Sequence, residues 1–270
     1  MACNLTGCAV LSPAGHATRP GHSVKPDRLP HDLELVILSL GLAGAQPRNV
    51  MSISHFEFSV VVVANDHNPT ILNPDFLERQ GIVQEGWGWE VMGPAITTPP
   101  FATVSYDSGV TVSVESHRLQ VIDTSALGVP QSSKVVDITQ KYVEVLPHVR
   151  YSAVGINFRS FVEHADANAF LKDHFLKSGV WDNEAHPLQT VGLKLVYPLD
   201  GGRLTFSLDS EIVTQRLEEE SIQVSGILIH ANFHRDCHDY PGNAQVMNRL
   251  GNAEKDWATY QNILSDLLNV

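Results

Sequence analysis

The sequence predicts an α+β protein built on an antiparallel sheet, and the order of its predicted elements leads to that fold class. Apolar runs with strand-like alternation are interspersed with segments whose apolar residues recur at helical spacing. Between residues 56 and 158 these segments read β-α-β-β-α-β, the order of a ferredoxin-like fold. From residue 164 onward they read α-β-β-β-α. The first half is therefore expected to be ferredoxin-like, a fold that by itself fixes no function.

The first strand and the first helix follow from local patterns. Residues 56–64 change from alternation to a continuous apolar run, which is typical of a strand buried on both faces. Asn73-Pro74-Asp75 predicts the start of a short helix, because proline and an acidic residue both suit a first helical turn.

The clearest hairpin lies at residues 101–115, where Asp107-Ser108-Gly109 forms the turn and valines alternate with polar residues in the second strand. Leu119 and Val121 resume the alternation on the opposite parity, which we interpret as a bulge or break near Ser116–His117. Ser132–Ser133 then caps a helix that Pro147 ends, and residues 150–158 return as a strand.

The second half begins with a predicted helix at about 164–177 and continues with three strands at 188–197, 203–211 and 221–233. The last helix has the strongest pattern, because apolar residues repeat along one face at spacings of three and four. These residues are Val246, Leu250, Ala253, Trp257, Tyr260, Leu264 and Leu267.

Residues 1–50 differ from the rest and are expected to be a disordered or non-native N-terminal extension. The apolar run at 33–45 is shorter than the ~20 residues that span a bilayer, and Asp32 and Glu34 stand where a signal peptide would be positively charged. Globular patterning starts near Met51, which we take as a hypothetical true start. Residues 51–270 are expected to form one globular region, with two sub-lobes, 51–160 and 161–270, as an open alternative.

Composition narrows the function classes. The 270-residue chain has a formal net charge of −12, which argues against non-specific nucleic-acid binding because that needs clustered Lys and Arg. Its three cysteines do not form a disulfide framework, which fits a reducing compartment and predicts a cytoplasmic protein. Because the apolar run at 33–45 is too short to span a bilayer, no membrane binding is expected.

One dense group of potential metal ligands occurs, at residues 230–239. His230 and His234 point to the same face of a strand but lie roughly 13 Å apart, too far to share one ion without a bend. The more workable set is His234, Cys237 and His238 with a fourth ligand from elsewhere, and imidazole with thiolate favours zinc. The alternative is a polar strand end whose histidines satisfy backbone groups, with no cofactor bound.

Two functions from different classes follow. The sequence contains none of the common nucleotide-binding, hydrolase or zinc-protease motifs, which favours a non-catalytic binding or assembly module that binds a protein partner or self-associates. The alternative is a divalent-metal-dependent hydrolase or lyase that uses His234, Cys237 and His238, with Asp236 or Asp239 as the base.

Two short stretches, residues 142–157 and 231–236, resemble segments of a family of sporadically distributed, uncharacterised bacterial hypothetical proteins. The resemblance implies a bacterial or phage-linked origin. It implies no activity, because the family brings none.

Overall fold

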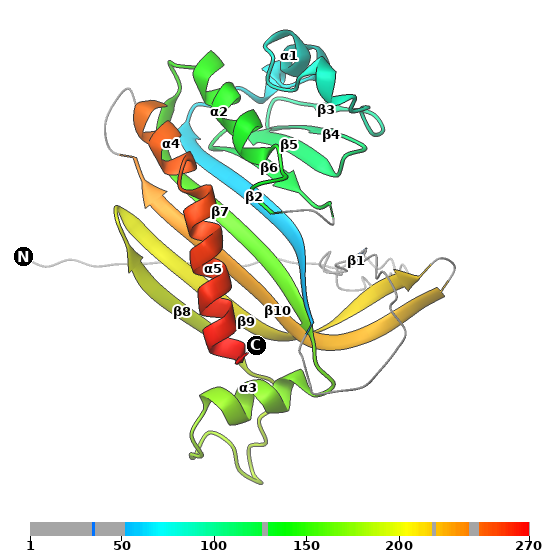
Figure 1. Ribbon diagram of the computed structural model, residues 1–270, viewed down its shortest axis with the longest axis vertical. Coiled ribbons are helices and arrows are strands. Elements are labelled where there is room, and N and C mark those ends of the chain that lie inside the picture. Colours follow the sequence, from blue (N-terminus) through cyan, green and yellow to red (C-terminus); the bar gives the residue numbers. More distant parts are fainter. Residues whose placement is uncertain (1–33, 36–51, 126–128, 218–219, 238–242, 270) are drawn as a thin grey trace, which may run out of the picture. The chain divides into compact units, whose positions relative to one another are not determined.

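The computed structural model describes residues 34–35, 52–125, 129–217, 220–237 and 243–269. Ten strands form one sheet in the order β1-β9-β10-β7-β2-β6-β5-β4-β3, and β8 pairs with β9 (Figure 1). All pairings are antiparallel except that of β1 with β9. The strands are β1 (Glu34–Leu35), β2 (Ile53–Asn65), β3 (Ile96–Thr97), β4 (Phe101–Ser105), β5 (Val110–Glu115), β6 (Arg118–Asp123), β7 (Arg150–Glu163), β8 (Gly192–Leu199), β9 (Gly202–Leu217) and β10 (Glu220–Asp236).

The described helices contribute their buried apolar residues to one cluster on one face of the sheet. In Figure 1, α2, α4 and α5 cross that face together. The helices are α1 (Pro74–Arg79), α2 (Val135–Val145), α3 (Ala167–Phe175), α4 (Asn243–Leu250) and α5 (Ala253–Leu268), with short 3₁₀ turns η1 (Pro69–Ile71) and η2 (Glu85–Trp87).

The core lies between the helices and alternate residues of the long strands. Phe58 and Val60 of β2, Phe158 of β7 and Phe233 of β10 are at most 1% exposed. Tyr260 of α5 packs its ring 5.4 Å from that of Phe158. Because strand side chains alternate between faces, the residues between these apolar positions point to the other side of the sheet.

The ferredoxin-like prediction is wrong, and the error arises at one turn. Ser116 and His117 are not a bulge but the turn of a second hairpin, so β6 returns alongside β5 and lies antiparallel to β2. Strands β4, β5 and β6 therefore form a meander. A ferredoxin-like sheet places a parallel neighbour beside its first strand, whereas both neighbours of β2, β6 and β7, are antiparallel to it.

The protein contains both helices and strands, as an α+β protein does, and most predicted elements lie close to their expected positions. The predicted last helix is divided into α4 and α5 at Gly251–Asn252, where the side-chain nitrogen Nδ2 of Asn252 donates to the carbonyl of Asn248. The residues of its predicted apolar face are buried, apart from Leu267, which is partly buried.

Residues 1–33 and 36–50 of the predicted extension lie outside the described residues. A single sheet joins residues 51–160 to 161–270, since β7 pairs with β10.

A buried ion pair fastens α5 to the sheet. The two terminal nitrogens of Arg235, at the end of β10, donate to the two carboxylate oxygens of Asp256, each at 2.6 Å. The side chains are 7% and 3% exposed, so neither charge is well solvated and each depends on the other.

Replacing Asp256 with Asn should lower the free energy of unfolding by about 3–5 kcal/mol, because it leaves the buried Arg235 guanidinium without a counter-charge. Urea denaturation measures the effect. The matched control is Asp137→Asn, whose partner Lys134 is exposed, and it should cost less than about 1 kcal/mol. Equal effects in both variants would contradict the assigned role.

A second polar contact joins α5 to β7 and β2 in the core. The hydroxyl of Tyr260 donates to Ser160 Oγ at 2.5 Å, and Ser160 Oγ lies 2.6 Å from His55 Nδ1. Ser160 is fully buried. This three-residue network satisfies polar groups that the packing of α5 would otherwise strand in the core.

His67, between β2 and η1, is buried against the rings of Tyr142 and Tyr151. Neither of its ring nitrogens makes a hydrogen bond of good geometry within the protein. Burial lowers the pKa of His67 to about 4, although the nearby Val62 carbonyl acts in the opposite direction. The ring is therefore neutral in the folded protein at neutral pH.

This lowered pKa predicts acid sensitivity. Between pH 6.5 and about pH 4 the unfolded chain binds a proton at His67 that the folded chain excludes, so stability falls as the pH falls. Over this pH range the free energy of unfolding falls by about 3 kcal/mol in total. We expect His67→Phe to flatten the dependence of unfolding free energy on pH in this window, measured by denaturation at a series of pH values. An unchanged slope would contradict the prediction.

Among the described residues, no helix is long and apolar enough to cross a membrane.

Candidate functional site

The face of the sheet opposite the helices carries a cross-strand row of polar and charged side chains. Glu57 of β2 lies opposite Arg159 of β7, which lies opposite His230 of β10. His230 in turn lies opposite Ser207 of β9, and Ser207 opposite Lys194 of β8. We call this surface the polar face and define it by these five residues and their neighbours Asn157, Asp209 and Asn232.

Arg159 and Glu57 form one end of the row, and an ion pair joins them. Arg159 Nη1 donates to Glu57 Oε2 at 3.0 Å, and the two side chains are 21% and 16% exposed. The guanidinium also lies over the ring of Phe56, 5.2 Å from its centroid. Phe56 reaches this face because β2 has a bulge between His55 and Glu57. Arg159 is thus held in place before any partner binds.

His230 lies between charges of both signs. It is exposed at the surface, but desolvation by the protein atoms around its ring lowers its pKa, and the Arg159 cation acts in the same direction. The Glu57 and Asp209 carboxylates act in the opposite direction. Desolvation also raises the pKa of Asp209, partly offset by His230. A neutral imidazole can donate and accept hydrogen bonds, so His230 suits recognition of a polar group.

Two asparagines extend the polar face next to this row. Asn232 Nδ2 donates to Asn157 Oδ1 at 2.6 Å, and Asn157 Nδ2 donates to the Ser59 carbonyl at 3.4 Å. Gly155 makes room for this pair, because a Cβ at that position would lie 3.1 Å from Asn232 Nδ2. The amide groups are therefore fixed by neighbouring strands.

A small apolar cluster adjoins the charged row. Phe161 and Val213 are buried in it, with Phe56 and Val224 packed against them. The Phe161 ring lies over Gly226 of β10, where a Cβ would collide with the ring and with the Val162 carbonyl. Gly226 is thus the residue that allows the aromatic ring to lie flat on this face.

We expect Gly226→Ala to destabilise the protein by about 1–3 kcal/mol, because the added methyl group overpacks the site beneath Phe161. Chemical denaturation measures the change. Gly86→Ala is the control, since a Cβ there meets no atom within 4 Å, and it should be nearly neutral. A neutral Gly226→Ala would show that Phe161 does not lie where the structure has it.

The structure places the two described members of the predicted metal set, His234 and Cys237, in different surroundings. His234 shares a face with His230 by alternation along β10, and its Nε2 lies 3.2 Å from Asp236 Oδ1. Cys237 is buried in the main core cluster, where burial raises the pKa of its thiol. His238 and Asp239 lie outside the described residues. Among the described residues, no group of three or more His, Cys, Asp or Glu side chains is arranged to hold a metal.

Sequence reasoning missed the polar face because its contacts are long-range. Glu57 and Arg159 are separated by 102 positions, and Asn157 and Asn232 by 75. A local signal existed, since Ser59, Asn157 and Asn232 interrupt apolar stretches with single polar residues. The pairing of the strands, which no single segment reveals, is what places them together.

No protein-family model matches the chain, and no curated protein matches it either.

Proposed function

We propose that this protein is a non-catalytic binding or assembly module that binds a protein partner through the polar face of its sheet. The observation that carries the proposal is the half-buried Glu57–Arg159 pair on that face, held by Phe56 and adjoining an apolar cluster. Arginine and aromatic residues, fixed in place beside apolar area, are the usual anchors of protein interfaces.

The chemistry of the face also indicates the kind of partner. Cations at Arg159 and Lys194 alternate with carboxylates at Glu57 and Asp209, so the face favours a surface that itself carries both signs. A second copy of the chain meets this condition, because a two-fold axis can place the acid of one copy against the base of the other. Self-association is therefore the first form of assembly to test.

Val196→Asp should weaken self-association, because Val196 is 57% exposed on β8 and shares its face with Lys194. Sedimentation velocity of the full chain over a wide concentration range is the measurement. The matched control is Ile212→Asp, since Ile212 is 66% exposed but lies on the opposite parity of β9, toward α3. We expect this control to self-associate like the wild type.

If both variants weaken association equally, the polar face is not the interface. A wild-type chain that stays monomeric throughout would contradict self-assembly and leave only a different protein as the partner.

We also propose that the protein is located in the cytoplasm and that its origin is bacterial or phage-linked. The alternative, a divalent-metal-dependent hydrolase or lyase at His234, Cys237 and His238, stays a prediction. The polar face supports the binding module more strongly, because its side chains are already held together by hydrogen bonds and an ion pair.

A further inference from the structure

A second surface lies on α3, away from the polar face. β7 ends at Glu163, and His164 leads the chain into α3, where Asp166 caps the helix by accepting from the Ala169 amide at 2.8 Å. The Asp166 amide donates to His164 Nδ1 at 3.2 Å, which fixes the imidazole ring beside the helix. Ala167 and Leu171 of α3 are buried in the core cluster, so the helix is anchored to the sheet.

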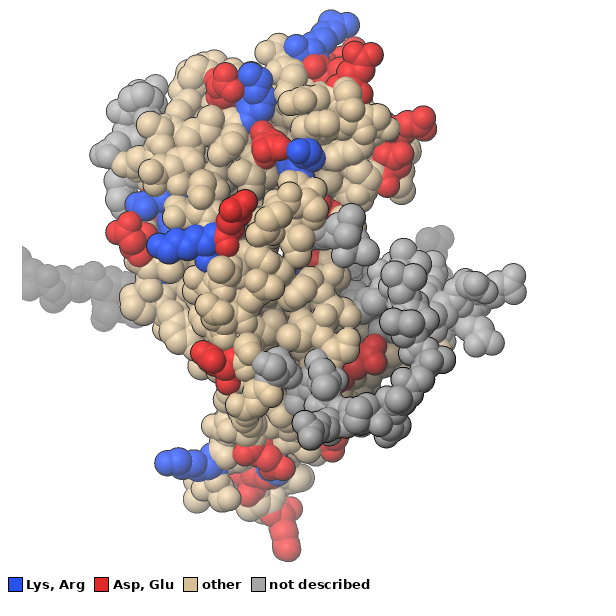
Figure 2. All heavy atoms as spheres, viewed as in Figure 1, with Lys and Arg blue, Asp and Glu red and all other residues tan. Residues whose placement is uncertain are grey.

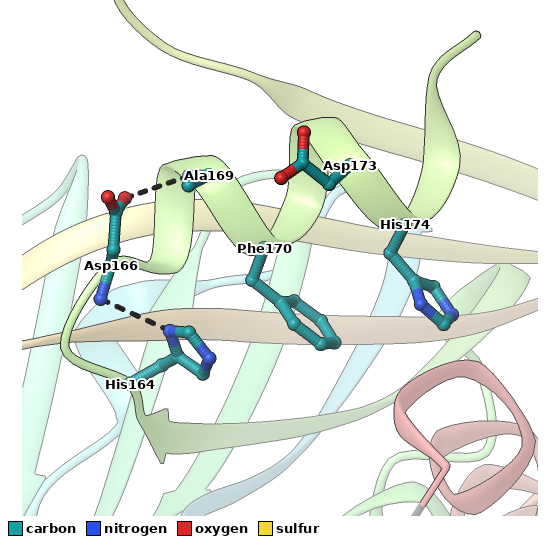
Figure 3. Close-up of a pocket in the computed structure, with 6 residues that line it drawn as sticks. All are labelled: His164, Asp166, Ala169, Phe170, Asp173 and His174. Carbon is teal, nitrogen blue, oxygen red and sulfur yellow. Dashed lines mark hydrogen bonds between the residues drawn. The ribbon is translucent and has the colours of Figure 1, made fainter.

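Three rings line up along this helix. Phe170 and His174 project from the same side of α3, the side on which His164 lies, as Figure 3 shows. The Phe170 ring centroid lies 5.0 Å from that of His164 and 5.2 Å from that of His174, and the Phe170 and His174 rings are nearly parallel, at 10°. We call these three residues the ring ladder. His174 is exposed and His164 and Phe170 are partly exposed, so the ring ladder reaches the molecular surface.

The ring ladder borders a hollow with a volume of about 400 Å³. Its lining contains two carboxylates and no Lys or Arg, and consists of His164, Asp166, Ala169, Phe170, Asp173 and His174. The nearest lysine on the helix, Lys172, is already paired with Asp182. The hollow is therefore lined by aromatic rings and by negative charge.

The surroundings have the same charge. Residues 163–190 contain five acidic side chains against two lysines. In Figure 2 the lower end of the molecule, where Figure 1 places α3, carries more Asp and Glu than Lys and Arg. A cationic group approaching this end is attracted by the negative charge, and the exposed His174 ring lies beside it.

We propose that the ring ladder and its carboxylates form a docking site for an arginine side chain in a basic peptide segment of a partner protein. A planar guanidinium stacks on an aromatic ring and donates to carboxylates at the same time, which a lysine ammonium does less well. This site goes beyond the polar face and involves none of its residues.

The test uses the full chain and fluorescein-labelled peptides of Gly and Ser that contain two residues of Arg, of Lys or of Gln. Fluorescence anisotropy at low ionic strength should show the order Arg, then Lys, then no binding with Gln. Asp173→Asn and His174→Gln should each weaken Arg-peptide binding about two- to five-fold. Both residues are exposed, so folding is expected to survive, and thermal unfolding checks this.

Asp266→Asn is the matched control, because it removes one exposed carboxylate from α5 and changes the net charge by the same amount. It should leave binding of the Arg peptide unchanged. Equal losses in Asp266→Asn and Asp173→Asn, or equal affinity for the Arg and Lys peptides with no effect of His174→Gln, would mean non-specific attraction to an acidic protein and would overturn the proposal.

Discussion

The alternation of side chains along β7 and β10 is the constraint on which the rest of the structure depends. These two strands pair over eleven positions, from Gly226 opposite Glu163 to Asp236 opposite Ala153. One parity carries Phe158 and Phe233 into the core, and the other carries Arg159 and His230 to the polar face. A slip of one residue would exchange the two sets, exposing the core and burying the charges. The register is therefore fixed by burial on one side and by the hydrogen bond from Asn232 to Asn157 on the other.

The same alternation explains why a charge lies in the core. Arg235 has the parity of Phe233, so it points toward the helices, where an unpaired guanidinium could not remain. Asp256 of α5 provides its counter-charge, and the pair, together with the contact of Tyr260 with Ser160, positions α5 on the sheet by polar geometry. Apolar packing alone is less directional, because the helix could slide along a uniform apolar surface. The position of α5 is thus specified by two polar contacts set in an apolar environment.

Local patterns in the sequence were sufficient for the elements and insufficient for their pairing. The hairpin at residues 101–115 and the apolar face of the last helix were predictable, since the signals lie within short segments. The change of parity near Ser116–His117 predicts a bulge or break, but a hairpin turn produces the same local pattern, and the predicted fold is wrong for that reason. Of the predicted metal ligands, His234 lies on β10 with the parity of His230, whereas Cys237 follows the end of that strand and is buried in the core. The opposition of Glu57 and Arg159 depends on strand order and could not be derived from either segment.

β7 connects the two surfaces for which binding is proposed. Arg159 lies on it within the polar face, and the chain reaches His164 only five residues later, at the start of the ring ladder. Between them, Phe161 is held on the polar face by Gly226, and Val162 is buried toward the helices. A strand fixed on both faces cannot rotate about its axis without disrupting both clusters. The two surfaces therefore have a constant spacing, so a partner that contacts both would bind a rigid template and would not have to order it first.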